Sequence, residues 1–332
     1  SGQITNTVTL NDWFRPFLSK LCPFGTANCL LFDPMVSYDQ IHGRFLIVAV
    51  SLDFSSRRSH WLISASKGAT FSSGWTNWVM DATITSGIQT STFIDYPKLG
   101  YDAEAVYVTG NTFNSINDFL YTKVRVLRKA QMYGPNPATE LTFWETWGLR
   151  NRNGVEVSTL YPPRLRGRTA ATYSSYYLVN TLDASNFATL WRVVNPAGNN
   201  PTLQQIQVND LLFYDKPPRV PQDSGVPLDI GDSGVQKAIL RDGYLYFAYN
   251  SGYRDEPITV TYARVNTRNG QLLSQTRWRG GNFFYPAFDV PASLGPQGHF
   301  PNILTVGTNT RNGSLTPLSI QGVKDGTYPY FE

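Results

Sequence analysis

A recurring segment constrains the fold of this chain more than any other feature. In each copy, a proline or its equivalent opens a short apolar strand, a turn follows, and a strongly aromatic strand comes next. The first copy begins at Asp33-Pro34, turns at His42-Gly43 and continues into the strand-like run 44–49. The five copies are anchored at Pro34, Pro97, Pro163, Val235 and Pro286, which recur every 51 to 72 residues. Such internal repetition is the signature of a repeat architecture.

The interval after each anchor holds about four runs rich in Val, Ile, Tyr, Phe and Thr, which is the pattern of β-strands. The clearest runs are Arg44–Ser51, His60–Ser66, Ala105–Gly110, Thr169–Asn180, Tyr244–Asn250, Ile258–Val265 and Ile303–Thr308. The best helix candidate is short, Val126–Tyr133. Four-stranded sheets repeated around an axis make a β-propeller. The sequence therefore predicts an all-β fold, a β-propeller of four-stranded blades, as a single domain over residues 1–332.

The number of anchors favours five blades, and the long intervals leave six or seven open. About three strand-like runs follow Pro286, one fewer than a blade needs. The N-terminal run Gln3–Leu10 is predicted to supply the missing strand and to close the ring. The alternative is a large β-sandwich or two separate β domains.

Composition agrees with this fold and excludes several others. The chain of 332 residues is 41% hydrophobic and 14% aromatic but only 16% charged, against about 25% charged in average proteins. Sheets stacked as blades bury both faces, which requires many apolar and aromatic side chains. No run approaches about 18 apolar residues, so no membrane span is predicted. The net charge of +4 comes from scattered basic residues, and without a basic stripe we predict no nucleic-acid partner.

Two cysteines give an indication of the cellular compartment in which the protein folds. Cys22 and Cys29 are separated by six residues that include Pro and Gly, so they can close a short loop as a disulfide. A structural disulfide is typical of a secreted, periplasmic or cell-surface protein. Two cysteines without a neighbouring histidine do not predict a zinc site. The oligomeric state is left open.

The repeat also predicts where a site lies. In a propeller, the starts of the innermost strands converge at one mouth of the axial channel. Five polar residues occupy that position in the five copies: Asp33, Asp95, Arg164, Asp232 and Tyr285. Paired carboxyl groups can divide acid and base roles, as glycoside hydrolysis requires. Two other readings stay open, because an Asp before a strand also caps turns and carboxylates near an axis can hold a structural calcium ion.

Tryptophans and one histidine add candidates for substrate binding. Trp75 and Trp78 lie in or beside a loop, where exposed aromatic faces can stack on sugars; the alternative is that they fill gaps between blades. His60 follows Arg57 and Arg58, which leaves a lyase-type site open. There is no G-x-S-x-G motif for a serine hydrolase, and no phosphate loop or dinucleotide fingerprint. No cofactor is predicted.

The segment Phe32–Ser51 resembles the first blade of secreted bacterial sialidase-like propellers, which read "DP-x-V-x-YD…RW" there. Their second-blade pattern, "YP-x-hydrophobic-G", is similar to Asp95–Gly100, and the likeness extends to Tyr285–Asn309. Ser64–Phe71 looks like the Asp-box hairpin of sialidases, with Ser66 in the place of its Asp. This resemblance implies a secreted propeller that recognises glycans.

The Asp33-Pro34 opening also resembles that of five-bladed arabinanase and xylosidase enzymes. The resemblance implies that Asp33 is a general base and that Asp95 tunes the general acid. The Glu that serves those enzymes as acid has no match in this chain, and Asp232 is the hypothetical substitute.

These observations predict a secreted propeller that binds and cleaves a polysaccharide or glycan in its axial funnel, as a glycoside hydrolase rather than a lyase. Asp33, Asp95 and Asp232 are the predicted catalytic residues. Two alternatives remain. A non-catalytic lectin or adhesion propeller would bind glycans and release no sugar. A structural or protein-interaction propeller at the cell surface would have no glycan affinity.

Overall fold

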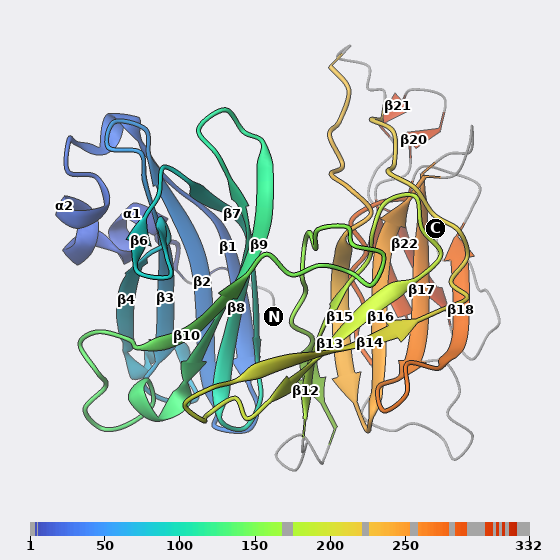
Figure 1. Ribbon diagram of the computed structural model, residues 1–332. Helices are drawn as coiled ribbons and strands as arrows, with labels where there is room; N and C mark the ends of the chain where they lie inside the picture. Colours follow the sequence, from blue (N-terminus) through green and yellow to red (C-terminus); the bar gives the residue numbers. More distant parts are fainter. Residues whose placement is uncertain are drawn as a thin grey trace. The chain divides into compact units, whose positions relative to one another are not determined.

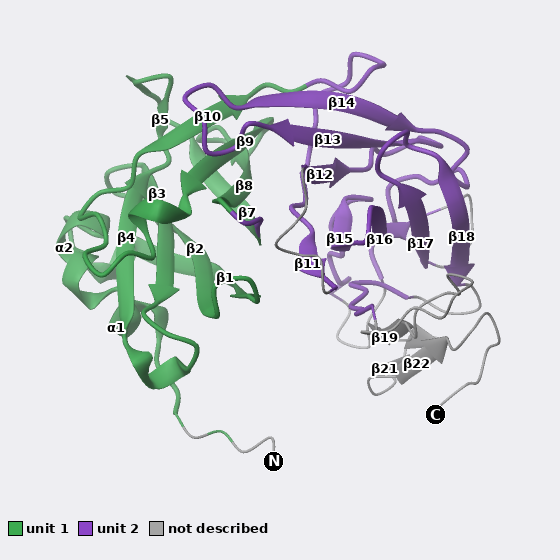
Figure 2. Ribbon diagram, turned by 90° about the horizontal axis from the view of Figure 1, so that it is seen from below, with its two compact units in different colours: residues 1–100, 104–149 green, residues 101–103, 150–332 purple. Residues whose placement is uncertain are grey.

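The computed structural model describes residues 4, 6–167, 175–220, 226–252, 258–278 and 283–290, together with the backbone of four short strands between residues 303 and 323. The chain divides into two compact units, each described here by itself. Unit 1 comprises residues 1–100 and 104–149, and unit 2 comprises residues 101–103 and 150–332 (Figure 2). The single-domain organisation expected from the repeat stays a prediction.

The first sheet of unit 1 is a four-stranded antiparallel meander in chain order (Figure 1). Its strands are β1 (Cys29–Asp39), β2 (Arg44–Asp53), β3 (Arg58–Ser66) and β4 (Trp75–Asp81). Every residue of β3 after the first is buried, so this strand is covered on both faces. Four short helices precede the sheet: α1 (Leu10–Trp13), η1 (Arg15–Phe17), α2 (Leu18–Leu21) and η2 (Thr26–Asn28).

The second sheet of unit 1 repeats this plan, with strand order β10-β9-β8-β7. Its strands are β7 (Phe93–Tyr101), β8 (Ala105–Phe113), β9 (Phe119–Arg128) and β10 (Phe143–Trp147). The connecting elements of unit 1 are η3 (Phe71–Ser73), the hairpin β5 (Ile84–Thr85) and β6 (Ile88–Gln89), and η4 (Lys129–Gln131). Two consecutive meanders of four strands are what stacked blades require.

The two sheets of unit 1 pack closely against one another. Trp61 of β3 is fully buried, and a Cβ added to Gly110 of β8 would lie 2.8 Å from its ring and 2.7 Å from Cγ1 of Ile94. The backbone N–H of Ile94 donates to Ser59 Oγ of β3 at 3.1 Å. Only a glycine fits at this contact without moving its neighbours.

A disulfide joins Cys22 to Cys29, as the sequence predicts. It links the end of α2 to the first residue of β1. Both cysteines belong to a buried apolar cluster with Phe14 and Leu21. The bond therefore ties the N-terminal helices to the first sheet.

Unit 2 contains a five-stranded sheet of order β11-β15-β16-β17-β18 and a three-stranded sheet of order β12-β13-β14. The strands of the first are β11 (Arg164–Arg166), β15 (Val235–Arg241), β16 (Tyr244–Ser251), β17 (Thr259–Asn266) and β18 (Leu272–Trp278). Those of the second are β12 (Tyr176–Asn180), β13 (Ala188–Val194) and β14 (Thr202–Val208). Two small pairs follow, β19 (Ile303–Gly307) with β22 (Ser319–Val323) and β20 (Thr310–Arg311) with β21 (Ser314–Leu315).

These sheets confirm the predicted fold class, an all-β propeller-type chain of consecutive, mainly antiparallel sheets with few helical residues. The predicted strands agree with β2, β3, β8, β12, β16, β17 and β19, and residues 168–174 of the predicted run Thr169–Asn180 lie outside the described residues. The count of five blades stays a prediction. Among the described residues, no helix is long and apolar enough to cross a membrane.

The predicted helix Val126–Tyr133 is wrong. Residues up to Arg128 belong to β9, and only the 3-10 turn η4 follows. Charged residues within this segment suggest an exposed helical face, but Lys123 and Arg125 of the same strand are fully buried. Both cations make polar contacts in the interior, so their charge does not mark an exposed face.

Parts of three other predictions also differ from the structure. The described residues of the predicted strand Gln3–Leu10 carry no strand, because Thr9 caps α1 by accepting the N–H of Asp12 at 3.1 Å. Residues 283–290, in the fifth copy, also carry no strand. In the third copy, β11 pairs in parallel with β15, whereas a bridge from Tyr161 to Val179 joins the chain to β12.

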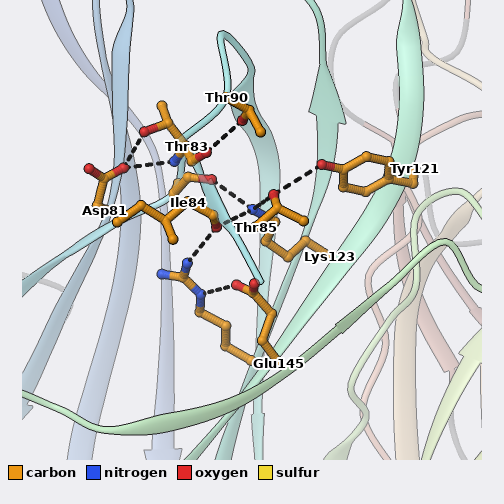
Figure 3. Close-up of polar contacts among 10 residues, drawn as sticks. Asp81, Thr83, Ile84, Thr85, Thr90, Tyr121, Lys123 and Glu145 are labelled. Atoms are coloured by element: carbon orange, nitrogen blue, oxygen red, sulfur yellow. Dashed lines mark hydrogen bonds and ion pairs between the residues drawn. The ribbon is translucent and has the colours of Figure 1, made fainter. Parts of the chain in front are cut away.

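The buried cations of β9 hold the β5–β6 hairpin (Figure 3). Lys123 Nζ donates to the carbonyl oxygens of Ala82 at 2.8 Å and Ile84 at 2.9 Å, and to Thr85 Oγ1 at 3.0 Å. Arg125 Nε donates to Glu145 Oε2 at 2.6 Å. Burial is the main cause that lowers the pKa of Lys123 to about 8.

The copies of the repeat share a backbone feature that the sequence pattern does not show. Asp33, Tyr96 and Tyr285 have φ of 51°, 54° and 51°, and each precedes a proline. Non-glycine residues rarely adopt this left-handed conformation, and holding it costs of order 1–3 kcal/mol. In β1 the register shifts between Phe32 and Met35. Asp33 stands between these two residues and therefore lies in a bulge.

Candidate functional site

Asp33 and Asp95 form a carboxyl pair in unit 1. Asp33 is exposed in the bulge of β1, and Asp95 is partly buried in β7. The charge of Asp33 contributes to the raised pKa of Asp95, so the two carboxyl groups lie near one another. The structure therefore brings together two of the three predicted catalytic carboxyl groups.

The pKa of Asp95 is raised above its ordinary value of 3.8. Burial is the largest cause, and the charge of Asp33 raises the pKa further. Two contacts act in the opposite direction, the N–H of Tyr96, which donates to Asp95 Oδ1 at 2.6 Å, and the charge of Lys98. The Lys98 ammonium itself lies 3.1 Å from the centre of the Tyr96 ring. Asp95 is thus the member of the pair more disposed to hold the proton.

An apolar groove of about 400 Å³ lies along β1. Its lining includes Pro34 and Met35, the two residues that follow Asp33 in the chain, together with Trp13 and Phe71, and does not include Asp33 itself. Phe71 is 54% exposed. A groove of this size lined by aromatic and aliphatic groups, with a few polar groups at its edge, is typical of small-ligand sites.

An aromatic cluster supports this groove. Trp75 packs edge-on against Trp13 at 5.0 Å and against Phe71 at 5.5 Å between ring centres. Its Nε1 donates to the carbonyl oxygen of Phe71 at 3.0 Å. Trp75, one of the predicted binding residues, is thus placed behind two rings of the groove. Trp78 is buried and donates to the carbonyl oxygen of Ala138 at 2.7 Å, which corresponds to the packing alternative.

Asp232, the third predicted catalytic residue, belongs to unit 2 and lies in a turn. Its Oδ1 accepts the N–H of Gly234 at 2.8 Å, and its Oδ2 accepts the hydroxyl of Thr159 at 3.4 Å. Burial is the main cause that raises the pKa of Asp232, and the charge of Asp183 adds to it. The contact with Gly234 is the turn-capping arrangement that the sequence leaves open as an alternative.

Arg164 and Tyr285 have different neighbours within unit 2. Arg164 is close enough to Lys237 that its charge helps to lower the pKa of that lysine to about 8, after burial as the main cause. Tyr285 is 45% exposed, and its N–H donates to Asn250 Oδ1 at 2.9 Å. Both stay predictions as binding residues.

His60 is 1% exposed on β3. Its Nδ1 lies 3.3 Å from Ser51 Oγ, and burial is the main cause that lowers its pKa to about 4. A neutral, enclosed imidazole packs in the core of the sheet, so we leave His60 out of the candidate site.

Several residues of these sites carry no repeat signal. Asp183 accepts the N–H of Ser233 at 3.1 Å, beside Asp232. In the sequence it lies in the loop between β12 and β13, outside the repeated segments. Trp13 is in a short helix before the first copy, and only its aromatic character could have marked it. Among the described residues, no group of three or more His, Cys, Asp or Glu side chains is placed to hold a metal ion; structural calcium stays a prediction.

No family model matches the chain, and no curated protein sequence matches it. Solved structures with similar folds include a sialidase from Trypanosoma rangeli in complex with sialic acid, at 9% identity and a TM-score of 0.48. That match covers 89% of this chain and 46% of the sialidase, so the chain spans about half of its length.

Two further similar structures match over nearly their whole length. One is a thermostable family-43 glycoside hydrolase, at 12% identity and a TM-score of 0.40, covering 92% of this chain and 93% of the enzyme. The other is an α-L-arabinofuranosidase from Lactobacillus brevis, at 13% identity and a TM-score of 0.45, covering 90% and 93%. At these TM-scores we take no functional residue from them.

Proposed function

We propose that this protein is a secreted glycan-processing propeller that cleaves a glycosidic bond with the Asp33–Asp95 pair. The observation that carries the proposal is the placement of an exposed carboxyl group, Asp33, near a partly buried one, Asp95, whose pKa is raised. Burial and charge separate the protonation states of such pairs and create a base beside an acid. The Cys22–Cys29 disulfide supports secretion.

In this mechanism Asp33 is the general base. Its carboxylate takes a proton from water as the water oxygen attacks the anomeric carbon, and the bond from that carbon to the leaving oxygen breaks. Asp95, whose raised pKa favours its protonated form, stands beside Asp33. Carboxyl groups that flank a glycosidic bond stand about 5 to 9.5 Å apart, so two neighbouring carboxyl groups act from one side of the sugar only. The leaving oxygen needs a separate acid, and we do not assign that role to Asp232, which caps a turn in unit 2.

The groove along β1 supports glycan binding. The ring faces of sugars are apolar, and aromatic side chains such as Phe71 and Trp13 pack against them.

The test is a glycan array followed by reducing-sugar release from every glycan that binds. Asp33→Asn should reduce release by at least about 100-fold, the usual worth of a general base, with unchanged melting temperature. Glu140→Gln, which neutralises an exposed carboxylate of unit 1, is the matched control. Equal release by Asp33→Asn and wild type sinks the proposal.

A second candidate function is that of a lectin, which the aromatic groove favours independently of the carboxyl pair. A lectin binds the same array glycans and releases no sugar from any of them. In that case Asp33→Asn leaves both binding and the absence of release unchanged.

A further inference from the structure

A second cavity of unit 1 lies apart from the groove along β1. It has a volume of about 350 Å³ and is lined by residues from β2, the β3–β4 turn, β4 and the segment after η4. The lining residues that matter here are Arg44, Ser66, Lys67, Thr76, Pro135 and Pro137. Its volume lies within the range of about 300 to 1,000 Å³ that small-molecule sites occupy.

The cavity carries two positive charges without a neutralising partner. Among the described residues of unit 1, the ion pairs involve other cations, and neither Arg44 nor Lys67 joins one. The nearest acid in the register is Asp39, which stands opposite Arg44 across the β1–β2 ladder. Its carboxylate is engaged elsewhere, with Lys129 Nζ at 2.6 Å and His42 Nδ1 at 3.2 Å. The Arg44 guanidinium also lies 5.8 Å from the centre of the Tyr133 ring. Among the described residues no carboxylate is paired with Arg44 or Lys67, so both charges remain for a ligand.

Arg44 also retains hydrogen-bonding capacity. Its Nε is buried and has no hydrogen-bond partner among the described residues. A buried donor without an acceptor is unfavourable, and more so when the group is charged. A guanidinium suits a carboxylate or sulfate because it can present two parallel donors.

The rest of the lining is suited to a sugar ring. Pro135 and Pro137 contribute rigid apolar surface, and Thr76 contributes a hydroxyl. Ser66 is already committed to the turn, since its Oγ accepts the N–H of Phe45 at 2.8 Å and donates to the carbonyl oxygen of Gly68 at 2.6 Å. These contacts fix the β3–β4 turn that carries Lys67 at the rim of the cavity.

We propose that this cavity binds the carboxylate-bearing residue of an acidic saccharide, with Arg44 and Lys67 as its anion-binding residues. The proposal rests on the proposed function in that it names the class of glycan the protein recognises. The cavity is lined by residues other than those of the groove and the carboxyl pair, so it can hold a residue of the chain that is not being cleaved.

The experiment measures binding by calorimetry to trigalacturonic acid, with its fully methyl-esterified form as the uncharged control. The protein carries Asp33→Asn, so that no ligand is consumed. We expect at least tenfold tighter binding of the acid form, and a loss of that preference at high salt, because screening weakens charge pairing. Equal affinity for both forms overturns the proposal.

Variants then locate the binding. Arg44→Gln should weaken the affinity for trigalacturonic acid by at least tenfold, the usual worth of a charge-assisted hydrogen bond. Lys67→Gln, at an exposed position that the fold does not depend on, should weaken it by about threefold. Lys20→Gln, which removes an exposed charge elsewhere in unit 1, should leave it unchanged. If Lys20→Gln matches Lys67→Gln, binding is only general charge attraction and the proposal fails.

Two further results separate the possible failures. If inorganic sulfate competes with an affinity equal to that of the trisaccharide, the cavity binds free anions and the saccharide assignment is overturned. If the acidic saccharide binds through Arg44 but the unmutated protein releases no sugar, the proposed hydrolase fails while this site stands. If neutral glycans alone are bound and cleaved, the hydrolase stands and this site fails.

Discussion

Asp33 in the bulge of β1 and Asp232 before β15 occupy positions that the repeat predicts to be equivalent, yet their carboxyl groups have different surroundings. Asp33 is exposed and lies near Asp95 of the neighbouring sheet. Asp232 is enclosed in its own turn, where Gly234 and Thr159 donate to it. An exposed carboxylate can meet a substrate, whereas one that caps a buried turn is already used by the backbone.

A raised pKa does not distinguish the carboxyl pair of unit 1 from Asp232 of unit 2. Burial is the largest cause that raises the pKa of Asp95 and also that of Asp232. Each also has a second carboxylate nearby, Asp33 in the first case and Asp183 in the second. Asp33, the candidate base, differs from Asp232, the turn cap, in its hydrogen-bonding partners and in its exposure to solvent.

The largest expected difference is in activity. Asp33→Asn should lower sugar release by at least about 100-fold, whereas Asp232→Asn should stay within about fivefold of wild type. The amide of Asn keeps an acceptor for the Gly234 N–H, so the turn is preserved and only the charge is removed. Initial rates on the best array substrate measure both variants. A loss of 100-fold in Asp232→Asn with an intact fold would support the acid role that the repeat predicts for it.

A smaller effect concerns the groove along β1, which gives unit 1 an aromatic surface. Phe71→Ala should weaken glycan affinity by about three- to tenfold, since an aromatic contact is worth roughly 0.5–1.5 kcal/mol. Phe54→Ala is the matched control, because Phe54 is 55% exposed and Phe71 is 54% exposed, and Phe54 does not line the groove. Titration calorimetry compares the two. Equal affinities in both variants contradict a role of the groove in binding.

The smallest effect is on protonation. Asp33→Asn removes a negative charge beside Asp95, so the pKa of Asp95 should fall toward its ordinary value of 3.8. Because folding raises this pKa, the folded state binds the proton more tightly, and stability declines as pH rises from about 3.8 through the folded pKa. Asp33→Asn should reduce that decline. Carbon-detected NMR titration of the carboxyl groups measures the change in pKa, with Asp232 as the internal control. An unchanged pKa of Asp95 would contradict an interaction between Asp33 and Asp95.

Much of the fold could be predicted because strands and turns are local. Prolines and aromatic runs located β2, β3, β8, β16 and β17 to within a few residues. The failure at Val126–Tyr133 has a physical reason, since the local pattern does not tell whether Lys129 faces water or, as in the structure, is buried in an ion pair with Asp39. His60 was considered for a site because of its arginine neighbours, but β3 is covered on both faces.

The candidate site could be predicted only in part. The repeat predicted equivalent positions for Asp33 and Asp95, which is how they became candidates, whereas the backbone counterpart of Asp33 is Tyr96. The proximity of the two carboxyl groups depends on the packing of two sheets, and spacing along the chain does not contain that information. Asp183 and Trp13 lie outside the repeat, so nothing in the pattern could select them.

The buried ammonium group of Lys123 has a consequence for the cooperativity of unfolding. The β5–β6 hairpin has strands of two residues and an Ile88 that is 69% exposed, features of a segment that frays independently. Opening it alone, however, would withdraw the acceptors of Ala82 and Ile84 from a charge enclosed by β9, at a cost larger than that of a neutral hydrogen bond. The hairpin and β9 should therefore open as one unit. The hydrogen-bonded amide hydrogens of this small surface hairpin should then exchange as slowly as those of β9.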